Sequence, residues 1–162
     1  MVMELLTMGA DLNPRDRMDG TPLDDAIRER HYKTMEMLCE SGARPEGIKV
    51  AIRLCDAAST GDVNLIKLLC EGGADPNVGD YDHRTCLHLA ASVGSVSVVD
   101  LLLKKPGMEL NPVDRFGGTP LDDAYRHGNR QCIFMLQLVG GKRGTDPEVI
   151  ADARKKEQVR TG

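Results

Sequence analysis

The segment NPRDRMDGTPLDDAIR at residues 13–28 returns as NPVDRFGGTPLDDAYR at residues 111–126, with twelve of sixteen positions identical. Two weaker relatives of this segment lie between the copies. One position of the shared pattern recurs at separations of 31, 33 and 34 residues, at Thr21, Ile52, Thr85 and Thr119. A glycine closes an apolar stretch with the same period, at Gly9, Gly42, Gly73, Gly107 and Gly141. A period near 33 predicts a chain of about four structural repeats.

Each repeat carries the signals of two helices. Thr119-Pro120 is typical of a helix start, because threonine caps free backbone N–H groups and proline fits the first turn. Leu121 and Ala124 share one face of that helix, where a small residue allows close approach. A second helix then ends at Gly-Ala, since glycine tolerates the left-handed conformation. One such pair cannot bury its apolar face alone, so the sequence predicts an all-α stack of mutually covering repeats.

The strings GADPN at 73–77 and TCLHLAASVG at 85–94, with both TPLDDA segments, resemble the consensus of ankyrin repeats. The resemblance implies an ankyrin-repeat solenoid of about four helix-turn-helix repeats, with short β-hairpin fingers and a C-terminal capping helix. It assigns His88 the task of tying its helix to the neighbouring finger. It also implies a protein–protein interaction module that binds a partner protein through a concave face of fingers and inner helices.

Residues 55–136 resemble more narrowly the ankyrin tail of eukaryotic glutaminases, through GDVNLIK at 61–67 and GDYDHRTCLHLAASVG at 79–94. The alternative function is therefore a non-catalytic C-terminal tail of a larger enzyme, such as a glutaminase-like amidohydrolase, or of a kinase or channel. The glutaminase active site resembles that of serine hydrolases with an SxxK motif. No serine of this chain has a lysine three residues later.

We expect three parts along the chain. Residues 1–16 form a partial N-terminal repeat with only its outer helix and finger, residues 17–146 form the ankyrin repeats, and residues 147–162 form a C-terminal helix and frayed tail. The finger within residues 43–52 is shorter than the others and contains Pro45, which predicts a local irregularity.

Composition and charge argue against several function classes. A net charge of −4 and a pI near 5.6 offer no basic field for nucleic acid, and no apolar run is long enough for a membrane span. The five cysteines include no CxxC pair, which argues against disulfides and zinc and fits an intracellular, cytoplasmic location. Asp24 and Asp25 point about 100° apart on a helix and do not converge on a ligand. We expect no catalysis, cofactor or metal, and the oligomeric state stays open.

The ankyrin resemblance also indicates which residues face a partner. Carried over position by position, the candidate binding residues are Arg17, Met18, Arg28, Tyr81, Asp82, Arg84, Arg115, Phe116, Arg126 and His127. Tyr81 and Phe116 are two of only five aromatic residues, and exposed aromatics are natural binding anchors. Alternatively, both fold down and cover the seam between repeats. The arginines suggest an acidic partner.

Asparagines at the finger bends allow two interpretations. Asn13, Asn77 and Asn111 each lie eight residues after a leucine and two after an acid, a pattern that resembles ankyrin asparagines modified by an asparaginyl hydroxylase. Alternatively, each asparagine closes its turn by hydrogen bonding, which is the ordinary task of asparagine in turns.

Overall fold

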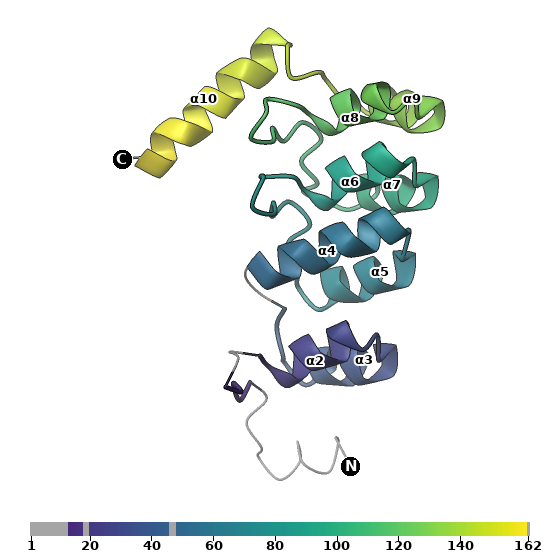
Figure 1. The fold of residues 1–162 in the computed structure, drawn as a ribbon, viewed down its shortest axis with the longest axis vertical. Coiled ribbons are helices and arrows are strands. Elements are labelled where there is room, and N and C mark those ends of the chain that lie inside the picture. Colours follow the sequence, from purple (N-terminus) through teal and green to yellow (C-terminus); the bar gives the residue numbers. More distant parts are fainter. Residues whose placement is uncertain (1–12, 18–19, 46–47, 162) are drawn as a thin grey trace.

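The computed structural model describes residues 13–17, 20–45 and 48–161. Within these ranges the chain is all-α, and the helix pairs stack into an elongated solenoid with the last helix projecting obliquely (Figure 1). The helices are α2 (Pro22–Arg28), α3 (Tyr32–Glu40), α4 (Ile48–Thr60), α5 (Val63–Glu71), α6 (Cys86–Val93), α7 (Val96–Leu103), α8 (Pro120–Arg126), α9 (Arg130–Leu138) and α10 (Pro147–Thr161). Residues 1–12, most of the expected partial repeat, lie outside the described residues, as does Met18.

The duplicated TPLDDA segments start α2 and α8 as their sequence predicts. Thr21 and Thr119 accept the backbone N–H of Asp24 and Asp122 on their hydroxyls, at 3.2 and 3.4 Å. Each aspartate in turn accepts the N–H of its threonine, at 2.9 and 3.1 Å. This reciprocal capping box satisfies backbone donors that the first helical turn leaves free. Asp24 and Asp122 therefore stabilise the N-termini of α2 and α8.

His88 replaces the capping aspartate in α6 and confirms its expected contact with the next finger. Its Nδ1 accepts the backbone N–H of Thr85 at 3.1 Å. Because Nδ1 accepts, the proton lies on Nε2, which donates to the carbonyl of Gly118 at 3.2 Å. The side chain is fully buried. Burial lowers the pKa of His88 below the ordinary histidine value, and the Gly118 carbonyl opposes this only in part.

Small side chains form much of the contact between inner helices. α4 packs on α6 and α6 on α8, while the outer helices α3, α5, α7 and α9 form the second column. Alanines with no exposed surface lie between the inner helices, at Ala57, Ala58, Ala90, Ala91 and Ala124. Larger apolar residues such as Leu69 and Leu102 fill the space between inner and outer columns. A stack of this kind buries each repeat against its neighbours.

The shortened second finger produces the expected irregularity. α4 has 13 residues, whereas α2 and α8 have seven and α6 has eight. Because α4 begins at Ile48, four residues before the position of Ile52 that aligns with the capping threonines, its first turn lies where the other repeats have finger residues.

The fingers are loops closed by aspartate side chains. The described residues contain no β-strand, so the hairpin part of the expectation is not confirmed. Asp80 Oδ1 accepts the N–H groups of Asp82 and Arg84, at 2.9 and 3.0 Å. Asp114 Oδ1 does the same for Phe116 and Gly118, both at 2.8 Å. These carboxylates satisfy N–H groups that a strand ladder would otherwise pair.

The last helix, α10, contacts the stack along a narrow strip. Val149 is buried, but most other described side chains of α10 are exposed. Lys156 reaches Glu109 near the last finger, with its Nζ 2.7 Å from the carboxylate. None of the described helices combines the length and apolar character that crossing a membrane requires.

Candidate functional site

Two neighbouring fingers present the candidate aromatic anchors. Tyr81 belongs to the finger between α5 and α6, and Phe116 to the finger between α7 and α8. Each is 76% exposed. Neither side chain therefore folds down over the seam between repeats, and both offer apolar area to a partner.

An arginine links these two fingers. Arg115 Nη1 lies 2.8 Å from Asp82 Oδ1, and the Arg115 backbone N–H donates to the Asp82 carbonyl at 2.9 Å. The Arg115 guanidinium also lies 5.4 Å from the centroid of the Phe116 ring, within cation–π range. Side chain and backbone together fix one finger relative to the next, so the aromatic pair sits on a preorganised surface.

Below the fingers, a buried aspartate forms ion pairs with two more of the candidate arginines. Asp123 is fully buried, with Oδ2 3.0 Å from Arg84 Nη2 and Oδ1 2.7 Å from Arg126 Nη1. Arg84 Nε is buried and has no hydrogen-bond partner among the described residues. Two guanidinium groups share one carboxylate, so this cluster keeps one positive charge in excess. We call Arg84, Asp123 and Arg126 the arginine cluster.

His127 borders the arginine cluster at the end of α8. Its Nδ1 lies 2.9 Å from the Asp123 carbonyl and 3.4 Å from the Ser92 hydroxyl. The ring is exposed, and these contacts hold it beside Arg126 on the surface of the inner helices.

The first repeat contributes to the list of candidates without joining this cluster. Arg28 pairs on its own helix, 2.7 Å from Asp25 and 3.1 Å from Glu29. Arg17 is exposed in the first described finger, two repeats before the aromatic pair. The two fingers and the arginine cluster therefore bring together most of the candidate binding residues, namely Tyr81, Asp82, Arg84, Arg115, Phe116, Arg126 and His127. Arg17 and Arg28 lie apart from them.

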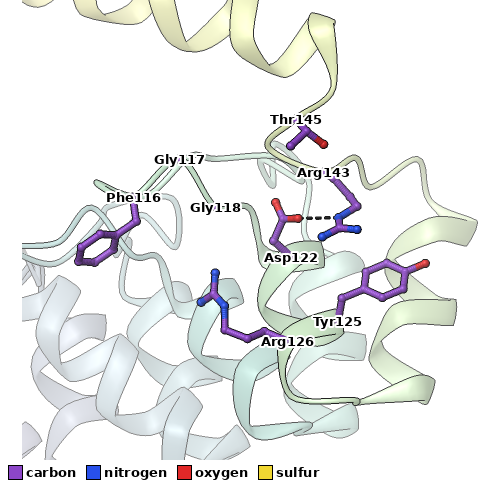
Figure 2. Close-up of a pocket in the computed structure, with 8 residues that line it drawn as sticks. All are labelled: Phe116, Gly117, Gly118, Asp122, Tyr125, Arg126, Arg143 and Thr145. Carbon is purple, nitrogen blue, oxygen red and sulfur yellow. Dashed lines mark hydrogen bonds and ion pairs between the residues drawn. The ribbon is translucent and has the colours of Figure 1, made fainter.

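Sequence reasoning missed a hollow of about 420 Å³ at the end of the stack. Figure 2 shows its lining residues, which are Phe116, Gly117, Gly118, Asp122, Tyr125, Arg126, Arg143 and Thr145. Arg143 Nε lies 2.7 Å from Asp122 Oδ1, and the guanidinium lies 5.0 Å from the Tyr125 ring centroid. Phe116 stands at the edge of this hollow, so the hollow adjoins the finger surface.

Asp122 organises the loop that borders the hollow. Its Oδ2 accepts the Gly144 N–H at 2.6 Å, in addition to its contacts with Arg143 and Thr119. Burial raises the pKa of Asp122, but these hydrogen bonds outweigh burial and hold the pKa below its ordinary value. The sequence predicted only the capping contact of Asp122 with Thr119, and not its contacts with Arg143 and Gly144.

Asn77 bonds to the following repeat, and Asn111 bonds to the loop that follows α9. Asn77 accepts the Glu109 N–H at 2.8 Å and donates to the Gly107 carbonyl at 3.0 Å. Asn111 accepts the Lys142 N–H at 2.6 Å. The side-chain amide of Asn77 thus connects consecutive repeats, whereas the turn at Asn77 is closed by Asp75, which accepts its N–H.

Burial keeps the cysteine thiols protonated, which fits a structural task. Burial raises the pKa of Cys55 to about 12 and raises that of Cys86 further. Cys55 donates to the Arg84 carbonyl and Cys86 to the Pro76 carbonyl, both at 3.3 Å. No group of three or more potential metal ligands occurs in the described part of the chain. Both ring nitrogens of His88 are already engaged.

Comparisons with known proteins agree with this architecture. Residues 54–149 match the family described as "Ankyrin repeats (3 copies)", and the chain belongs to the ankyrin-repeat family. It is 37% identical over 131 residues to serine/threonine-protein kinase 12 of Arabidopsis thaliana, covering 81% of this chain and 28% of the kinase. It is 43% identical over 84 residues to potassium channel SKOR of the same plant, covering 52% of this chain and 10% of the channel.

The predicted likeness to glutaminases is also confirmed. The chain is 34% identical over 116 residues to the mitochondrial liver isoform of glutaminase from Rattus norvegicus, covering 68% of this chain and 19% of that enzyme. It spans less than a third of each of these relatives. The shared region is the repeats, which in this chain form a non-catalytic module.

Proposed function

We propose that this chain is a protein-interaction module that binds a partner through the two fingers carrying Tyr81 and Phe116 and the arginine cluster below them. The observation that carries the proposal is the 76% exposure of both aromatic side chains on fingers joined by Arg115 and Asp82. Burying such side chains supplies most of the affinity in many protein interfaces. A surface that is already fixed loses little entropy on binding.

The charge of this surface favours an acidic group of the partner at the arginine cluster. Arg28 pairs with Asp25 of its own repeat, and Arg115 pairs with Asp82 of the preceding finger. In the arginine cluster, by contrast, two guanidinium groups share one carboxylate. We propose that a carboxylate of the partner approaches Arg126, whose side chain is 58% exposed, while its apolar residues cover Tyr81 and Phe116.

The relatives support a second proposal about context. Kinase, channel and glutaminase relatives are all much longer than the matched region. We propose as the alternative that these repeats serve as the non-catalytic interaction region of a larger chain. The five free thiols fit a reducing compartment, for which we propose the cytoplasm.

The test uses a phage-displayed library of peptides from disordered protein regions, selected against the full chain. Binding of the selected peptides is then measured by fluorescence anisotropy for the wild type and for Tyr81→Ala/Phe116→Ala. We expect a loss of at least about tenfold, since aromatic anchors commonly contribute that much. Phe134→Ala is measured in parallel, because Phe134 is also aromatic and 65% exposed but lies on outer helix α9, and peptides bound at the fingers should bind this variant as they bind the wild type. Equal affinities of wild type and double variant would overturn the proposal.

A further inference from the structure

The exposed face of the last outer helix differs from the exposed faces of outer helices α5 and α7. In α5, the fifth and ninth residues after the N-cap are Lys67 and Glu71, an ion pair of 3.9 Å. In α7 the same positions hold Asp100 and Lys104, paired at 2.6 Å. Opposite charges at this spacing suit a helix face that stays in water.

In α9 the same two positions are apolar. Counted from the N-cap Asn129, they are Phe134 and Leu138. Phe134 is 65% exposed and Leu138 is 74% exposed. Two large apolar side chains one helical turn apart therefore replace a pair of charges. Nothing in the described structure covers them, so they lie in water where burial would be favourable.

Stacking of a further repeat would not cover these positions. α5 and α7 each have an outer helix on both sides, yet the side chains of Lys67 and Lys104 remain 60% and 73% exposed. The fifth and ninth positions thus stay exposed even where an outer helix lies on both sides. A further repeat stacked on α9 would therefore leave Phe134 and Leu138 exposed.

A single cation completes the stripe. Arg130 is the first residue of α9 and precedes Phe134 and Leu138 at steps of four, so all three lie along one helix face. It is exposed, and within the described ranges it makes no ion pair. The corresponding first residues of α5 and α7 are Val63 and Val96, which pack against the core. We call Arg130, Phe134 and Leu138 the α9 stripe.

We propose that the α9 stripe binds an amphipathic helix of a partner protein, which lays an apolar ridge on Phe134 and Leu138 and places a carboxylate beside Arg130. Residues three and four apart on a helix form such a ridge and match the spacing of the stripe. A second copy of this chain is a poorer occupant, because α9 contains no acidic residue to pair with Arg130. This interface is separate from the fingers and independent of the function proposed for them.

The experiment selects a phage-displayed library of 18-residue helical peptides on the full wild-type chain. The counter-selection uses Phe134→Asp/Leu138→Lys, which recreates the ion pair of α7 and should unfold at the wild-type temperature. We expect peptides with apolar residues at three- and four-residue spacing and at least one acid. Both this variant and Arg130→Glu should weaken their binding by at least about tenfold. Exchanging the peptide's acid for lysine should restore binding to Arg130→Glu, whereas Tyr81→Ala/Phe116→Ala should bind as the wild type does.

Three results would overturn the proposal. The selection yields no peptide that distinguishes the wild type from the counter-selected variant. The selected peptides lose binding with the Tyr81 and Phe116 variant instead, which places them on the fingers. Sedimentation equilibrium shows a dimer of the wild type that Phe134→Asp/Leu138→Lys abolishes, which makes a second copy the occupant.

Discussion

The guanidinium of Arg84 lies 3.0 Å from the fully buried carboxylate of Asp123, although 39 residues separate the two in sequence. Arg84 precedes α6, whereas Asp123 lies in the first turn of α8, so the pair joins consecutive repeats across the concave side. Among the described residues, the earlier copy of the duplicated motif shows no such link between repeats. Asp25, which corresponds to Asp123, has a side chain that is 52% exposed and pairs with Arg28 of its own helix.

Asp123→Asn should therefore destabilise the chain far more than Asp25→Asn. We expect Asp123→Asn to lower the free energy of unfolding by about 1–3 kcal/mol, because it strands Arg84 and weakens a link between repeats. Asp25→Asn should have little effect, because exposed ion pairs contribute little. Urea denaturation at neutral pH measures both. Similar losses for the two variants would show that burial of Asp123 adds nothing to the pair.

Asp122 and Asp24 offer a second matched pair. Both occupy capping boxes, but only Asp122 also accepts Gly144 N–H and contacts Arg143. At pH 7, Asp122→Asn should cost about 1 kcal/mol of unfolding free energy and more than Asp24→Asn.

The cost of Asp122→Asn should also depend on pH. The pKa of Asp122 is lower in the folded chain than in the unfolded one, so its charged form favours folding. That contribution is complete above the unfolded pKa, near pH 4, and is lost as pH falls through the folded pKa. The gap between wild type and Asp122→Asn should therefore narrow between pH 7 and pH 3. A gap of constant size in urea denaturation series at the two pH values would contradict the assigned hydrogen bonds.

Local signals account for what could be predicted, and contacts between repeats account for most of what could not. Thr119-Pro120 and Asp122 start α8 as expected, because a capping box is completed within four residues. The partner of Asp122 in the terminal loop, Arg143, lies 21 residues away and has no counterpart in the earlier copy of the motif. The contact between Arg143 and Asp122 depends on the path of the loop after α9, and the repeat period does not specify that path.

The fingers and the anchors illustrate the same limit. The β-hairpin expectation followed from the family, but Asp80 and Asp114 close their loops with side-chain oxygens. Exposure of Tyr81 and Phe116 was left open by the sequence, because an aromatic at a finger fits either a seam or a binding surface. The exposure of Phe134 could have been predicted, because the equivalent positions of the two preceding repeats hold the charged residues Lys67 and Asp100.

His88 should give the chain a measurable dependence on mild acid. Burial lowers its pKa, so the unfolded chain takes up a proton on His88 more readily than the folded chain. The associated stability is complete above the unfolded pKa, near 6.5, and falls as pH drops through the folded pKa, with a slope of up to about 1.4 kcal/mol per pH unit. His88→Gln should remove this slope between pH 7 and pH 5.5 in urea denaturation. His31→Gln, at an exposed position, should retain it, and an unchanged slope in His88→Gln would place the pH dependence elsewhere.

Two equivalent glycines should respond differently to alanine. Gly94 and Gly128 follow inner helices α6 and α8 with φ of 75° and 70°, so alanine strains either backbone. A Cβ on Gly128 meets nothing within 4 Å, whereas one on Gly94 comes 2.7 Å from Asn129 Oδ1. Asn129 donates to the carbonyls of Ala91 and Ser92 at 2.8 and 2.7 Å, and these bonds join α6 to the last repeat.

Gly128→Ala should therefore cost about 1 kcal/mol of unfolding free energy from backbone strain, and Gly94→Ala about 2–3 kcal/mol because it also displaces Asn129. Urea denaturation of a double-mutant cycle separates the two contributions. In the background of Asn129→Ala, the cost of Gly94→Ala should fall to that of Gly128→Ala, since no amide remains to be displaced. If Gly94→Ala keeps its full cost in that background, the loss comes from the backbone at Gly94 and the Asn129 amide does not couple the last two repeats.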